Sequence, residues 1–108
     1  MFRALLFLVL SLLCQTVFAK YKPEAGDLLF QDLDCGPFCD AIEKVTDGKD
    51  GKEFSHIGML VQVGDSLLVL EAGERGVVLS SMSNFLDRNL TSAGTPKVYV
   101  GRLLNNRW

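Results

Sequence analysis

Apolar residues fall into short runs separated by glycine-rich polar turns, a pattern typical of a small mixed α and β domain. Two apolar stretches flank Gly64 and Asp65, and this dipeptide between strand-like runs predicts a β-hairpin. The pattern predicts strands over residues 27–31, 54–63, 66–72, 77–79 and 97–103 and a short helix that begins at Ser80 or Ser81. The order predicts an α+β domain whose main sheet is antiparallel.

A longer helix is predicted to begin at Pro37, because proline at the first helical position loses no hydrogen bond. Apolar residues then recur at helical spacing and form one side of this helix; they are Phe38, Ala41, Ile42 and Val45. Residues 48–53 are polar and glycine-rich, which indicates an exposed loop after the helix.

Residues 1–19 have the three parts of a secretory signal peptide. A positive start at Arg3 precedes the apolar run 4–13, and Ala19 ends the segment with a small residue. An uncleaved anchor is the alternative, but the run is shorter than the roughly 20 residues that span a bilayer. We therefore expect a secreted or periplasmic protein with a single domain over residues 20–108.

Charge and ligand types narrow the classes of partner. The net charge is −2, and acidic and basic residues alternate without a basic stripe, which argues against nucleic acid. Two cysteines and one histidine in residues 20–108 are a poor zinc set. We expect no cofactor and no stable membrane span once the signal peptide is removed.

His56 and Glu71 are the first candidates for catalysis. His56 is the single histidine of the chain, and its imidazole is a natural general base near neutral pH. Gly58, two residues later on the same face, leaves space beside the ring. Residues counted outward from the Gly64–Asp65 turn place Glu71 near His56, at the end of the hairpin away from the turn. A carboxylate there could fix the imidazole tautomer. The alternatives are a structural histidine and a strand-end carboxylate that reaches water.

Cys35 and Cys39 are the second candidates, since Cys14 leaves with the signal peptide. In an oxidising compartment this pair is expected to form a disulfide. Alternatively, Cys35 beside a helix N-terminus could be a nucleophile, because the helix dipole lowers a thiol pKa there. The Cys-x-x-x-Cys spacing argues against a thioredoxin-like redox site.

Several segments taken in order resemble the YiiX-like permuted papain-like cysteine hydrolases, relatives of the NlpC-type peptidoglycan peptidases. They are residues 26–31 (GDLLFQ), 34–42 (DCGPFCDAI), 54–58 (FSHIG), 70–72 (LEA) and 76–77 (GV). The resemblance implies a circularly permuted papain-like fold, with His56 as general base and Glu71 as the orienting residue. It also implies thiolate attack on an amide or ester carbonyl, with cell-wall peptides or acylated molecules as substrates.

The sequence departs from this family because no cysteine follows His56. The family's late nucleophile and its helix are missing, so we interpret the chain as a partial domain that is inactive alone, with one apolar face of the sheet exposed. The alternatives are a hydrolase that uses Cys35 as nucleophile, and a non-catalytic binding module of the cell envelope. In a variant of the binding module, a separate partner chain supplies the cysteine helix and covers the exposed face.

Overall fold

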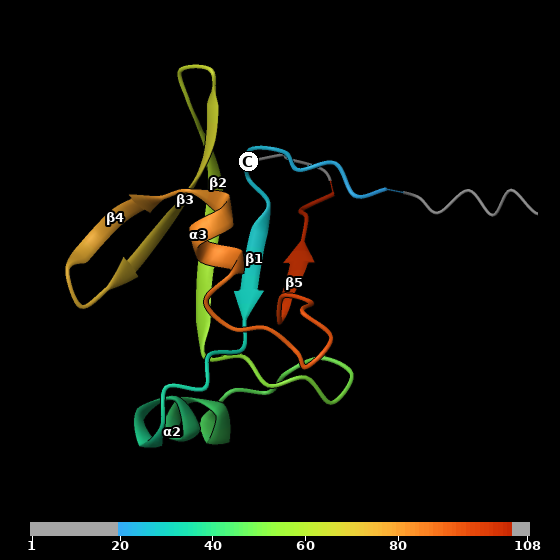
Figure 1. The fold of residues 1–108 in the computed structure, drawn as a ribbon, viewed down its shortest axis with the longest axis vertical. Coiled ribbons are helices and arrows are strands. Elements are labelled where there is room, and N and C mark those ends of the chain that lie inside the picture. The colour runs from blue at the N-terminus through green and yellow to red at the C-terminus, as the bar shows by residue number, and fades with distance from the viewer. Residues whose placement is uncertain (1–19, 105–108) are drawn as a thin grey trace, which may run out of the picture.

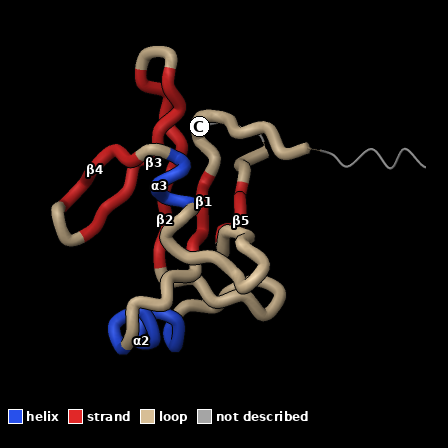
Figure 2. The backbone as a smooth tube through the Cα atoms, in the orientation of Figure 1, coloured by secondary structure: helices blue, strands red, loops and turns tan. Residues whose placement is uncertain are grey.

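The computed structural model describes residues 20–104. The predicted signal peptide, with Cys14, lies outside these residues. The elements are β1 Leu28–Gln31, α2 Pro37–Val45, β2 His56–Val63, β3 Ser66–Gly73, β4 Gly76–Ser80, α3 Met82–Leu86 and β5 Val98–Gly101. Each predicted strand and helix is therefore present, with ends that move by a few residues (Figure 2).

One antiparallel sheet has the strand order β4-β3-β2-β1-β5 (Figure 1). Strands β2, β3 and β4 form the predicted meander, and the first hairpin turns at Gly64 and Asp65, where Val63 pairs with Ser66. Strand β1 adds beside β2, and β5 adds beside β1, with Leu28 opposite Gly101. The α+β class with an antiparallel sheet is confirmed.

Helix α3 covers one face of this sheet and completes its core (Figure 1). Ser81 caps the helix, because its hydroxyl accepts a hydrogen bond from the Asn84 amide at 3.1 Å. Phe85 on α3 is fully buried against Leu29, Leu60 and Val69 from three neighbouring strands. Burial of these side chains is the main driving force that holds α3 on the sheet.

The opposite face of the sheet is called the uncovered face below. It consists of the even-numbered residues of β1 and β3 and the odd-numbered residues of β2, β4 and β5, which the strand register places on one side. Large apolar side chains on this face, such as Ile57, Val77 and Leu79, are exposed. Within residues 20–104, no element packs over it as α3 packs over the other face.

Helix α2 forms where predicted, but its apolar side is not buried among the described residues. Phe38, Ala41 and Val45 are exposed, Ile42 is partly buried, and Cys39 is the one fully buried residue of the helix. The helix lies beyond the end of β2 rather than against the sheet (Figure 1). The amphipathic pattern therefore predicted the helix correctly, but it did not predict a contact between the helix and the core of the sheet.

An ion pair between the buried Asp27 and the exposed Arg102 joins the start of the described chain to its end. Arg102 donates two hydrogen bonds to Asp27, at 2.7 and 2.8 Å, and the Tyr21 hydroxyl donates a third at 2.6 Å. The pKa of Asp27 is held well below its ordinary value, chiefly by Arg102, although burial opposes this. Among the described helices, none has the length and apolar character needed to cross a membrane.

Candidate active site

His56 and Glu71 come together on the α3 side of the sheet. Glu71 in β3 is directly opposite Gly58 in β2, so His56 is its diagonal neighbour on the same face. His56 Nε2 lies 3.1 Å from Glu71 Oε1. The carboxylate is buried and does not reach water as a strand-end charge would.

Arg88, just after α3, binds the same carboxylate and was not among the candidates from the sequence. Its two terminal nitrogens donate to Glu71 Oε1 at 2.5 Å and to Oε2 at 2.8 Å. The guanidinium also donates to Asn84 Oδ1 at 3.1 Å, which orients it from the helix side. This two-pronged pairing is the strongest geometry that a carboxylate and an arginine can adopt. It ties the end of α3 to β3.

The pKa of Glu71 follows from two opposed effects. Burial, the largest single influence, raises it by disfavouring the charged form. Hydrogen bonds from Arg88, Ser80 and His56, with the charge of Arg88, outweigh burial and leave the pKa below its ordinary value. Glu71 is therefore ionised at neutral pH.

The space above Gly58 is filled by Phe85 rather than left open beside the imidazole. A Cβ at Gly58 would lie 3.0 Å from Phe85 Cε2, closer than packed carbons approach. The Phe85 ring then lies beside His56, with centroids 5.8 Å apart and planes at 32°. Gln31, opposite His56 in the register, donates to the Phe85 carbonyl at 2.6 Å. Gly58 thus allows the contact that holds the imidazole against α3.

The ionised carboxylate fixes which imidazole nitrogen carries the proton. Glu71 only accepts hydrogen bonds, so the neutral His56 ring presents Nε2–H to it and keeps a lone pair on Nδ1. Nδ1 makes no hydrogen bond to any of residues 20–104. Its lone pair can accept a proton from a nucleophile or a water placed beside it.

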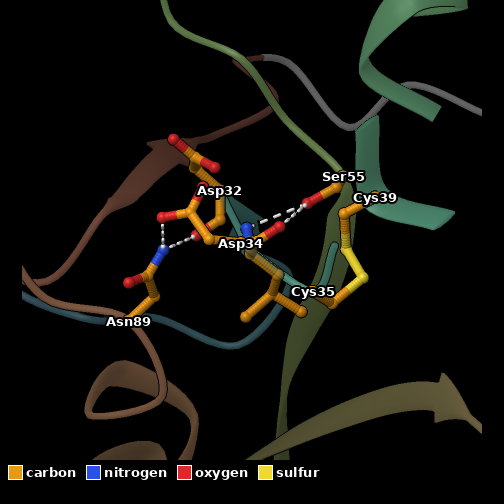
Figure 3. Close-up of a disulfide and its surroundings, with 7 residues drawn as sticks. Asp32, Asp34, Cys35, Cys39, Ser55 and Asn89 are labelled. Atoms are coloured by element: carbon orange, nitrogen blue, oxygen red, sulfur yellow. Dashed lines mark hydrogen bonds between the residues drawn. A yellow bond between two sulfur atoms is a disulfide. The ribbon is translucent and has the colours of Figure 1, made fainter. Parts of the chain in front are cut away.

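Cys35 and Cys39 form a disulfide (Figure 3). The Cα atoms are 5.2 Å apart, within the usual range for such bridges, because Cys35 lies two residues before α2. Gly36 between them has φ = 80°, a left-handed conformation that glycine adopts without a steric penalty. In this oxidised form Cys35 has no thiolate, so it cannot attack a carbonyl.

The disulfide lies beside a hydrogen-bond network that fixes the segment after β1 (Figure 3). Ser55 Oγ accepts from the Leu33 amide at 2.9 Å and donates to its carbonyl at 3.1 Å. Asn89 donates to the Asp32 carbonyl and to the Asp34 carboxylate, each at 2.9 Å. Because Ser55 precedes His56, this network anchors the start of β2 and the candidate base.

An open depression of about 340 Å³ touches His56 from the uncovered face, and its other walls include Phe30, Ile42, Ile57 and Ala72. It has an apolar lining, with α2 at one end. Within residues 20–104, no three histidine, cysteine or acidic side chains are grouped as a metal ion requires.

Comparisons with family models, with curated proteins and with solved structures give no match.

Proposed function

We propose that His56 and Glu71 are the base half of a thiol-dependent site that hydrolyses amide or ester bonds, in an exported chain of the cell envelope. The resemblance to permuted papain-like cysteine hydrolases supports this assignment. Cell-wall peptides or acylated molecules are the substrates that this resemblance implies. The chain by itself is proposed to be inactive, because no cysteine follows His56 in the sequence.

The observation that carries the proposal is the 3.1 Å contact between His56 Nε2 and Glu71, combined with an Nδ1 that makes no hydrogen bond within residues 20–104. A carboxylate that holds one imidazole nitrogen leaves the other as an oriented base. In a thiol hydrolase that base takes the cysteine proton, and the thiolate then adds to the carbonyl carbon. The leaving amine or alcohol departs with the proton returned by the imidazolium, and water releases the acyl group.

The tautomer is the direct test of the base assignment. Long-range ¹H–¹⁵N correlation spectra of the single histidine should show the neutral ring protonated on Nε2. The variant Glu71→Gln should give a mixture of tautomers, because an amide can either donate or accept. A neutral ring protonated on Nδ1 in the wild-type protein would overturn the proposal.

Turnover tests the second half of the proposal. The purified chain should not hydrolyse peptide or ester substrates above the rate shown by His56→Gln. Activity that depends on His56 would show that the chain holds its own nucleophile. Activity that appears only after reduction, and disappears in Cys35→Ser, would favour Cys35 as that nucleophile.

A non-catalytic binding module is the second candidate, and Arg88 favours it. Arg88 occupies both oxygens of Glu71, so the carboxylate also serves as a structural link between β3 and the end of α3. In that case Glu71→Gln would lower the free energy of unfolding. A change in the tautomer of His56 would not alter the binding of a partner.

A further inference from the structure

The strand residues on the uncovered face carry no charge. At the β1–β5 end the loop before β2 overlies them, where Phe54 packs on Phe30 and Tyr99 and Lys52 Nζ lies 5.6 Å from the centroid of the Tyr99 ring. None of the strand residues that point to this face is acidic or basic, whereas 22% of the whole chain is charged. Solvent-exposed faces of antiparallel sheets normally alternate to polar residues. A row of apolar side chains on this side therefore indicates a surface that is covered in the functional state.

The exposed area on this face is large enough for a stable contact. Val77 is 71% exposed and Leu79 49%, and the exposed fractions of Ile57, Met59, Val63 and Tyr99 lie between 37% and 47%. Together they leave on the order of 500 Å² of apolar surface in water, near the largest patches found on monomeric proteins. Two such faces bury on the order of 1,000 Å² between them, and the partly exposed residues of the same rows bring the total into the range of specific interfaces, about 1,200–2,000 Å².

We propose that the uncovered face is a dimer interface, on which a second copy of this chain packs sheet against sheet. Because the strand residues of this face carry no charge, two copies of it do not repel each other along the strands. Two twisted antiparallel sheets pack face to face about 10 Å apart, so that rows of alternate side chains interdigitate. A two-fold axis lets the same patch serve both copies and closes the assembly at two.

The proposed dimer leaves the candidate base free to be tested separately. His56 and Glu71 point to the α3 side, opposite the uncovered face. Helix α2 bounds one end of the uncovered face through Ile42, at the depression beside Ile57. A second copy packs on the uncovered face, including Ile57 at the rim of that depression, and does not need the imidazole on the opposite side.

The test is the oligomeric state of the purified protein that remains after removal of the predicted signal peptide and begins at Lys20. Sedimentation equilibrium across low to high micromolar concentration should show a monomer–dimer equilibrium. Leu79→Asp should shift this protein to monomer, because it places a charge in the interface. Val100→Asp is the matched control: Val100 is 41% exposed but lies on the α3 face of β5, so the dimer should persist.

Circular dichroism separates loss of the dimer from loss of the fold, because Leu79→Asp should keep the wild-type spectrum. Peroxide oxidation of Met59 gives an independent measurement in the wild-type protein and should slow as the dimer forms. A wild-type protein that stays monomeric, or that forms larger aggregates, would overturn the proposal. Equal loss of the dimer in Val100→Asp would also overturn it, as would Met59 oxidation that is independent of protein concentration. None of these outcomes bears on the tautomer of His56, so the dimer and the proposed function are tested separately.

Discussion

Replacement of Arg88 by methionine tests how the buried carboxylate of Glu71 is stabilised. The variant keeps most of the side-chain length but removes both donors to Glu71. Loss of one partner from a buried ion pair costs about 3–5 kcal/mol. The Arg88 side chain is 30% exposed, so water replaces part of the pairing. We expect Arg88→Met to lower the free energy of unfolding by about 2–3 kcal/mol at neutral pH.

The pH dependence of this loss gives a sharper test than its size. In the wild-type protein the pKa of Glu71 is lowered from its ordinary 4.5, so its contribution is present above that pH. The contribution is lost as the pH falls through the lowered pKa. Without Arg88, burial is the dominant influence and raises the pKa of Glu71 instead. The variant should therefore recover stability on acidification toward pH 4.5, by about 1.4 kcal/mol for each pKa unit of the rise.

The assay is urea unfolding followed by circular dichroism, with the two proteins compared at each pH between neutrality and the ordinary pKa of Glu71. The difference between them should shrink as the pH falls, since ionisable groups that do not contact Glu71 contribute equally to both. Arg75→Met, at an exposed arginine in the turn before β4, is the matched control and should show no such trend. When Arg88→Met is added to Glu71→Gln, the further change in stability should be independent of pH, because the titrating carboxylate is absent from both proteins. A loss in Arg88→Met that stays constant with pH would refute the reasoning.

Two further predictions concern the packing around Gly58 and the hydrogen-bonded hydroxyl of Tyr21. Gly58→Ala should lower the free energy of unfolding by about 1–3 kcal/mol in urea titrations, because its Cβ would lie 2.5 Å from Val69 Cγ1. Gly73→Ala is the control, since a Cβ there meets nothing within 4 Å; equal losses would contradict the packing argument. In a spectrophotometric titration, one of the two tyrosines should ionise only near pH 12, because burial and the hydrogen bond to Asp27 raise the pKa of Tyr21 to about 12. Tyr21→Phe should remove the ionisation step near pH 12. If that step persisted in Tyr21→Phe, the raised pKa would belong to another residue.

Local sequence signals predicted the parts of the fold that depend on neighbouring residues. The turn at Gly64 and Asp65 fixed the β2–β3 hairpin, and with it the approach of His56 to Glu71. The place of β5 beside β1 could not be predicted in this way, because the two strands are far apart in the sequence. Such pairing is decided by the closure of a long loop and by burial, which leave no short motif.

The role of Arg88 escaped prediction for a related reason. Arg88 follows a helix of only five residues, and nothing in its spacing from Glu71 places it on β3. A general rule could have raised the question, since a buried carboxylate after four apolar residues needs a compensating charge. The rule does not say which basic residue supplies that charge. The answer depends on how Phe85 docks α3 on the sheet.

Arg88 also decides which task Glu71 can perform for His56. A carboxylate shared with a guanidinium stays ionised and accepts the Nε2–H bond, so it fixes the tautomer and the ring orientation. The same guanidinium offsets much of its negative charge, so Glu71 stabilises an imidazolium less than an unshared carboxylate would. The arrangement therefore suits a base that is oriented in its neutral form. In the proposed thiol hydrolase, the thiolate would supply the negative charge that stabilises an imidazolium.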